Sequence, residues 1–346
     1  MSGTGTAPAP HHWRDLDGLR GALSLCIVLL HFGINRFLDR EFGWPGFCFD
    51  LSVDVFFVMS GFVLTRSFRN RRPSIGQFIA GRIFRLWPVY LVTTALLLGL
   101  SAKPPGFWDV FQELFAAKPI GGRQPINFPA WSVTWEFFVP VVAVIVLGKS
   151  RIPAWIKAAC AIFVVAAMAA TSLGVAKGED LFLIRSILGL ALGNLLYGAF
   201  CSAARPRFNA ATSYSLLAAL FAIMAFAPQF PALALALPLI ASGLVLSLAT
   251  GTTRVLSSRG AQWLGAVSYT MYLAHIPVLQ GLAWVFGTRL DANPGLKLGG
   301  IVLTLLLALL LTLTVEQPFM RLGKRLVGGD TRRPGNSPAE RAVDGR

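Results

Sequence analysis

The stretch RDLDGLRGALSLCIVLLHF, residues 14–32, decides the fold class of this chain because it is an apolar helix that carries ionisable groups. Arg20 and His31 are eleven positions apart, which at about 100° per residue leaves their side chains roughly 20° apart on one helical face. At about 1.5 Å rise per residue, His31 lies about 16 Å deeper than Arg20. Such groups are costly in hydrocarbon unless they face other helices. The stretch therefore predicts one span of a membrane-embedded helix bundle.

The composition extends this prediction to the whole chain. Of 346 residues, 55% are hydrophobic and 14% are charged, whereas soluble domains have about 25% charged residues. Apolar runs long enough to cross a bilayer recur from end to end, which favours an all-α polytopic membrane protein over a soluble helical one. The net charge of +15 is typical of arginine-rich cytoplasmic loops, so no nucleic-acid partner is predicted.

The apolar runs predict about ten transmembrane helices. We place them near residues 16–35, 51–68, 82–100, 131–148, 154–173, 181–202, 210–227, 231–250, 262–286 and 297–319. An even number of spans puts both ends of the chain on the same side of the membrane. Most of the 31 Lys and Arg residues fall on that side, so the positive-inside rule places both termini in the cytoplasm.

The chain divides into three parts by composition. Residues 1–15 form a short cytoplasmic segment without an apolar core, so the first span rather than a cleaved signal peptide is expected to direct insertion. Residues 16–321 form one transmembrane domain, and residues 322–346 are polar and predict a disordered cytoplasmic tail. The longest outer loop, 101–130, contains the aromatic segment 107–115, which predicts an interfacial helix.

Two features of the sequence concern packing and the thiols. Gly189, Gly193 and Gly198 in the sixth span have the spacing that allows close helix packing. The four cysteines show no metal-ligand spacing, and three of them fall in apolar spans, so no disulfide framework is predicted.

Three ionisable residues are predicted to lie in the outer half of the membrane. They are His31 in the first span, Asp54 at the start of the second and Glu136 near the start of the fourth, in the segment that begins at Trp131. An imidazole beside a carboxylate is the usual general base, because the carboxylate fixes the tautomer and stabilises the imidazolium. Either carboxylate could serve His31 in this way. The competing interpretation is a polar network that only holds helices together.

The ninth span adds a polar face. Ser268, Tyr272 and His275 are at i, i+4 and i+7 and therefore point to the same side of a helix. A metal site built from His31, His275, Asp54 and Glu136 is disfavoured, because no HxxH or HExxH spacing is present.

A second group of charges is predicted at the cytoplasmic face. Arg20, Arg82 and Arg85 lie there with Glu316, which is near the end of the last span. Arg82 and Arg85 are three positions apart on one helical face, and such a pair can bind phosphates with forked hydrogen bonds. The arginines of the loop 66–72 are better explained as topology signals that contact anionic lipid.

Taken together, these motifs resemble the acyltransferase-3 family of integral membrane acyltransferases. The matching stretches are Leu16-Asp17-Gly18-Leu19-Arg20 with ten residues to His31, residues 53–62 (VDVFFVMSGF), residues 82–88 (RIFRLWP), Trp131-Ser132 with Glu136, Ser268-Tyr269 with Tyr272-Leu273 and His275-Ile276-Pro277, and Glu316-Gln317-Pro318. They cover roughly residues 14–322 in order. The residues Phe137, Phe138 and Val139 depart from the family pattern, where many members place Gln, Phe and Tyr, so the resemblance implies the class of enzyme but not its acceptor preference.

The resemblance implies a membrane O-acyltransferase. Such a protein moves an acyl group, most often acetyl, from cytoplasmic acyl-CoA to a hydroxyl of an exported carbohydrate, in the inner (plasma) membrane of a bacterium. In this scheme Arg20, Arg82 and Arg85 bind the donor, and His31 with Asp54 or Glu136 activates the acceptor. Ser60, Trp131, Ser268, Tyr272, His275 and Glu316 bind substrate or form a structural polar network, and no metal is required.

Several alternatives stay open at this point. Transfer can be direct or pass through a covalent acyl-enzyme on His31 or Ser60. Intramembrane histidines and acids also serve proton relays, so a transporter of glycans or small solutes is the main competing function. A scaffold in an envelope-assembly complex is the third. Some relatives carry an additional SGNH-type hydrolase-like domain, which this sequence does not contain.

Overall fold

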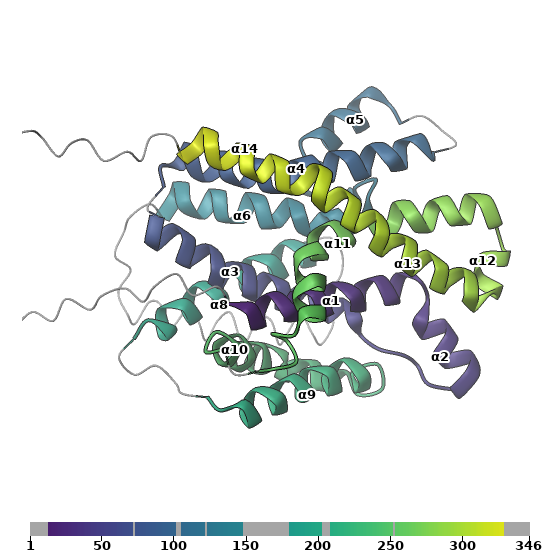
Figure 1. The fold of residues 1–346 in the computed structure, drawn as a ribbon, viewed down its shortest axis with the longest axis horizontal. Coiled ribbons are helices and arrows are strands. Elements are labelled where there is room, and N and C mark those ends of the chain that lie inside the picture. Colours follow the sequence, from purple (N-terminus) through teal and green to yellow (C-terminus); the bar gives the residue numbers. More distant parts are fainter. Residues whose placement is uncertain are drawn as a thin grey trace, which may run out of the picture.

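A computed structural model describes residues 13–71, 73–101, 105–121, 123–147, 180–202, 208–251 and 253–328. These residues form an elongated bundle in which many helices, α4, α6 and α14 among them, run roughly along the long axis, whereas the first part of α11 stands across it (Figure 1). The main helices are α1 (Arg14–His31), α3 (Ser52–Arg71), α4 (Ile75–Gly99), α6 (Trp131–Leu147), α8 (Asp180–Phe200), α9 (Ala210–Phe226), α10 (Leu237–Leu248), α11 (Arg259–Phe286), α13 (Pro294–Leu311) and α14 (Gln317–Gly328). The all-α membrane fold predicted from the sequence is confirmed.

Helices occupy the predicted spans except 154–173, which lies outside the described residues. Among the described residues, five helices are long and apolar enough to cross a membrane, or six if the bent pair of α1 and α2 (Ile34–Phe42) is one span. The number of ten therefore stays a prediction. The bend between α1 and α2 is 64° and occurs at Gly33, whose φ of +82° belongs to the left-handed region that glycine tolerates.

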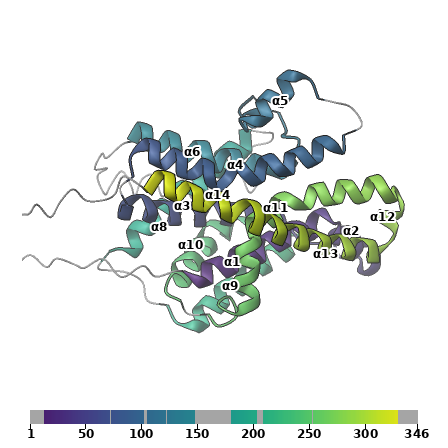
Figure 2. The same cartoon turned by 45° about the horizontal axis from the view of Figure 1, so that its top comes forward.

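The two ends of the described chain lie at the same end of the bundle, because α1 begins there and α14 ends there (Figure 1, left). In the turned view α14 and α13 follow one another across the front of the molecule, with α4 and α6 above them and α9 and α10 below (Figure 2). Between α13 and α14, residues Thr312–Glu316 form a π-helical turn. Such wider turns interrupt the α-helical ladder and are frequent at functional sites.

Glycines allow the closest helix pairs to form. A Cβ on Gly193 of α8 would lie 2.1 Å from the carbonyl oxygen of Val58 in α3, and one on Gly189 would lie 2.5 Å from the Cβ of Phe57. Close packing was predicted for both positions and is confirmed. Gly198 differs, because a Cβ there would meet no described atom within 4 Å. Small residues matter at such interfaces because association inside a membrane depends on van der Waals contact.

The loop 101–130 is only partly a surface loop. It contains α5 (Phe107–Leu114), a helix where the sequence predicted one, with Phe107 and Trp108 among its exposed aromatic residues. The following segment enters the bundle, because Asn127 is fully buried and donates a hydrogen bond to the carbonyl of Leu273 in α11 (2.9 Å). The buried Glu113 accepts hydrogen bonds from the Ile126 amide and the Tyr90 hydroxyl. Hydropathy did not predict this because the segment is polar.

The contact of Gly193 with α3 can be tested by adding a single methyl group. Gly193→Ala is expected to lower the apparent Tm of the purified protein by about 2–10 °C, since overpacking a close interface costs about 1–3 kcal/mol. Gly198→Ala, on the same helix, is the matched control and should leave the Tm unchanged or slightly higher, because Ala favours helix. Equal Tm values for the two variants would contradict the close approach of α3 and α8.

Candidate active site

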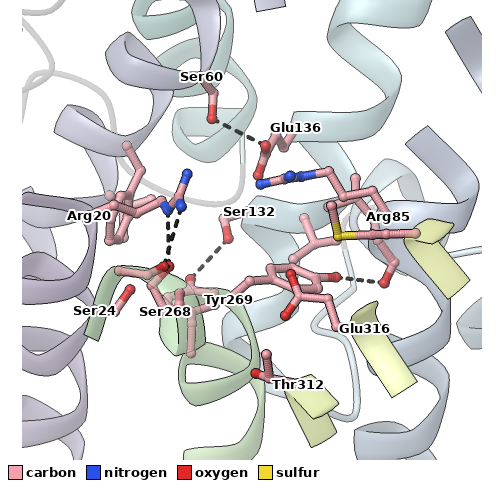
Figure 3. Close-up of a pocket in the computed structure, with 18 of the residues that line it drawn as sticks. Arg20, Ser24, Ser60, Arg85, Ser132, Glu136, Ser268, Tyr269, Thr312 and Glu316 are labelled. Atoms are coloured by element: carbon pink, nitrogen blue, oxygen red, sulfur yellow. Dashed lines mark hydrogen bonds between the residues drawn. The ribbon is translucent and has the colours of Figure 1, made fainter. Parts of the chain in front are cut away.

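A cavity of about 280 Å³ lies among α1, α3, α4, α6, α11 and the π-helical turn that precedes α14. Seven of the twelve predicted site residues line it: Arg20, Ser60, Arg85, Glu136, Ser268, Tyr272 and Glu316 (Figure 3). The other five, which are His31, Asp54, Arg82, Trp131 and His275, lie outside its lining. Side chains predicted at the cytoplasmic face and Glu136, which is predicted in the outer half of the membrane, therefore line the same cavity.

Arg20 is held in place by three partners. Its Nε donates to the Ser268 hydroxyl (3.0 Å), and Nη2 donates to the Gly265 carbonyl (3.3 Å) and pairs with Asp17 (2.9 Å). Both Ser268 and Gly265 belong to α11, which crosses α1 closely at Gly21. Arg20 therefore presents a fixed cation to the cavity, as Figure 3 shows.

The predicted arginine pair of α4 is divided between two environments. Arg85 lines the cavity and forms no hydrogen bond or ion pair with any residue that the structure describes. Arg82 is 5% exposed, pairs with the Glu136 carboxylate (3.3 Å) and donates to the Glu136 backbone carbonyl (2.5 Å). The reason is that α4 begins at Ile75 rather than at residue 82. Arg82 is therefore two turns inside the helix, where a buried charge requires a partner.

Glu136 lies at the level of Arg82, which corrects its predicted place beside His31. Its carboxylate accepts a hydrogen bond from Ser60 (3.1 Å) in addition to the Arg82 contact. Figure 3 shows Glu136 and Arg85 on the same side of the cavity. Trp131, one and a half turns earlier in α6, packs its ring against Phe57 at 6.0 Å between centroids.

Glu316 ends the π-helical turn and is 7% exposed. Its Oε2 atom has no hydrogen-bond partner among the described residues. Arg85 and Arg20 are the positive charges that act most strongly on it. The cavity therefore contains two guanidinium groups, of which that of Arg85 pairs with no described residue, and a carboxylate oxygen that accepts no hydrogen bond from the described part of the chain.

Tyr272 lines this cavity and also lies near one of the histidines. Its hydroxyl is within hydrogen-bond distance of the Ser132 hydroxyl (2.9 Å) and donates to the Pro129 carbonyl (2.9 Å). The His275 ring centroid is 6.1 Å from that of Tyr272, and neither histidine lines the cavity. His31 is half-buried, and its Nδ1 is 3.3 Å from Nε2 of His275.

The predicted pairing of His31 with a carboxylate is not found among the described residues. Asp54 instead accepts two hydrogen bonds from Arg185 of α8, at 2.8 and 2.6 Å. Both side chains are nearly buried, and a forked pair of this kind satisfies the arginine better than a distant imidazole would. The catalytic roles assigned to His31, Asp54 and Glu136 stay predictions.

Three structural residues of the site were missed by the sequence analysis. Arg185 interrupts the apolar run of the sixth span, so the rule that intramembrane charges have partners could have singled it out. Asn127 and Glu113 gave no such signal, because they lie in a polar loop. Within the described part of the chain, no group of three or more His, Cys, Asp or Glu side chains is arranged to hold a metal ion.

One family model matches most of this chain. A family model described as an acyltransferase domain, Acyl_transf_3, covers residues 13–313. The chain belongs to the acyltransferase-3 family. The predicted resemblance is thereby confirmed, and the protein is a membrane acyltransferase. No solved structure matches it.

Three curated relatives resemble parts of this acyltransferase. "Protein 2 in picA locus" of Rhizobium radiobacter is 34% identical over 161 residues, which are 38% of this chain and 81% of the relative. A Komagataeibacter xylinus protein named as a membrane-bound transacylase, BcsY, is 34% identical over 27% of this chain and 25% of its own length. The acyltransferase MdmB of Streptomyces mycarofaciens is 29% identical, with 36% of each chain covered. The last two are therefore matched over about a third of their length or less.

The pairing of Asp54 with Arg185 predicts a rescue experiment. Asp54→Ala should destabilise the acyltransferase by about 3–5 kcal/mol, because it leaves a buried arginine without its counter-charge. Replacing both residues, as Asp54→Ala with Arg185→Leu, should recover most of that loss in a thermal or denaturant unfolding measurement. Asp39→Ala, which removes an exposed carboxylate of α2, is the control and should have little effect. A double variant as unstable as Asp54→Ala alone would show that Asp54 has a different partner.

Proposed function

We propose that this acyltransferase transfers an acyl group, with acetyl as the expected group, from cytoplasmic acyl-CoA to a hydroxyl of an exported carbohydrate. The acceptor is a surface polysaccharide or its precursor, and the protein lies in the inner (plasma) membrane of a bacterial cell. The observation that carries the proposal is the position of Arg85, which lines a membrane-level cavity with Arg20 and has no protein partner among the described residues.

Acyl-CoA fits the chemistry of this cavity. Its head group carries a pyrophosphate and a 3′-phosphate, and phosphate is the anion that guanidinium groups bind best. The unpaired Oε2 of Glu316 suits a hydroxyl or amide N–H donor, and the pantetheine arm has both. The arm is long and narrow, so it can extend between the apolar rings of Phe56 and Phe57 toward Tyr272.

His31, which lies outside the lining of the cavity, is the proposed general base. In the proposed reaction the acceptor hydroxyl gives its proton to the imidazole, and its oxygen attacks the thioester carbonyl. The C–S bond then breaks, and the CoA thiolate takes up the proton. The membrane depth predicted for His31 from the sequence supports this role, because a base at that depth would lie between a cytoplasmic donor and an exported acceptor.

The competing interpretation as a transporter is not favoured by any feature of the cavity, and family membership supports the enzyme.

Purified protein in nanodiscs should release CoA from acetyl-CoA when a carbohydrate acceptor is present. His31→Ala is expected to reduce acyl transfer by about 10²-fold or more, which is the usual size of a general-base contribution. A stably folded His31→Ala variant with normal transfer would exclude the proposed base.

The role of Arg85 can be separated from a general effect on the cavity by comparing two donors. Arg85→Ala should raise the KM for acetyl-CoA by about 10- to 100-fold, since a hydrogen bond to a charged group contributes about 1.5–3 kcal/mol. The KM for acetyl-pantetheine without phosphate should stay unchanged. Arg259→Ala, which removes an exposed charge at the start of α11, is the matched control. A similar loss with both donors would contradict phosphate binding by Arg85.

A further inference from the structure

His31 and His275 form a pair of neighbouring imidazoles, and the mechanism proposed above gives a role only to His31. Nε2 of His275 lies 3.3 Å from Nδ1 of His31, and the ring centroids are 4.9 Å apart. His275 is fully buried, whereas His31 is only partly buried. The two residues come from α11 and α1, the same two helices that hold Arg20.

The backbone fixes which nitrogen of His31 carries the proton. Nδ1 of His31 is 2.9 Å from the carbonyl oxygen of Ile27, one turn earlier in α1. A carbonyl oxygen only accepts hydrogen bonds, so neutral His31 carries its hydrogen on Nδ1. Its Nε2 therefore has the free lone pair, and no described residue forms a hydrogen bond to that atom.

The same argument determines which ring nitrogen of neutral His275 carries the hydrogen. Because Nδ1 of His31 already carries a hydrogen, Nε2 of His275 can only meet it as an acceptor. Neutral His275 must then carry its own hydrogen on Nδ1, and its ring lies close enough to the backbone of Met271 and Tyr272, one turn earlier in α11, to interact with their carbonyls.

We infer that His275 is a positioning residue that takes the place of the carboxylate beside the general base His31. This inference rests on the proposed function. The lone pair of His275 Nε2 and the Ile27 carbonyl together hold the imidazole with Nε2 free. When that atom accepts the proton of the acceptor hydroxyl, both hydrogen bonds from Nδ1–H become bonds from a cation and strengthen.

The proton count of the reaction is unchanged by His275. The hydroxyl proton moves to Nε2 of His31 and then to the CoA thiolate, while one C–O bond forms and one C–S bond breaks. His275 keeps its own proton on Nδ1 throughout. Its contribution is to lower the energy of the imidazolium at the moment when it forms, in a region where water is scarce.

Three substitutions at His275 distinguish this role from simple packing. Phe keeps the ring but lacks the acceptor, so His275→Phe should lower kcat for acetyl transfer by about 10- to 100-fold, as loss of an orienting partner usually does. His275→Gln places its amide oxygen near the position of Nε2 and should recover much of that loss. His275→Asn places its oxygen near Nδ1, too short to reach His31, and should stay as low as the Phe variant.

The KM for acetyl-CoA should stay within about two-fold in all three variants, because His275 does not line the cavity proposed for the donor. Thermal unfolding is measured alongside to compare folding. Equal kcat values for the Gln and Asn variants, or a fully active Phe variant, would overturn the inference. If the Phe variant does not fold, the comparison of Gln with Asn decides alone. His31→Ala is run in parallel, so that failure of the proposed base is seen separately from failure of its partner.

Discussion

The close crossing of α1 and α11 is the constraint on which the other features of the site depend. A Cβ on Gly21 would lie 2.5 Å from the backbone nitrogen of Gly265, so the two helices touch backbone to backbone. Beside that contact, Arg20 donates a hydrogen bond to Ser268. Ten residues after Gly21 and Gly265, the same two helices bring His31 and His275 together. One helix pair therefore sets the distance between Arg20 in the cavity and the pair of histidines.

Charge pairing inside the bundle is selective. Arg82 and Arg185 pair with Glu136 and Asp54, which offsets part of the cost of burying them. Arg85 has no such partner among the described residues, and the Oε2 atom of Glu316 accepts no hydrogen bond from any of them. Both of these paired arginines lie outside the cavity lining, whereas Arg85, which lines it, is unpaired within the described part of the chain. This contrast separates the two kinds of intramembrane arginine better than their positions in the sequence do.

The fold class, the family and most helix positions could be predicted from the sequence, because hydropathy over twenty residues and ordered motifs are strong signals. The pairings between the buried charged side chains could not be predicted from the sequence. The depth that the sequence predicts for a charged side chain depends on where its helix is taken to begin. Because α4 begins at Ile75, Arg82 lies two turns inside the helix and pairs with Glu136. Asp54 pairs with Arg185, which is 131 positions away in the sequence. The entry of Asn127 into the bundle had no hydropathy signal at all, since its stabilisation comes from specific hydrogen bonds.

The long sequence separation of these contacts has a consequence for biosynthesis. Arg20 and Ser268 are 248 positions apart. At about 5–20 residues per second, roughly 12–50 s pass between synthesis of the first helix and that of its partner. During this time α1 is in or near the membrane with a cation and an imidazole that have not yet met α11. The newly inserted protein is therefore an exposed substrate for membrane quality control until its ninth predicted span arrives, and chains that stop early are expected to be degraded.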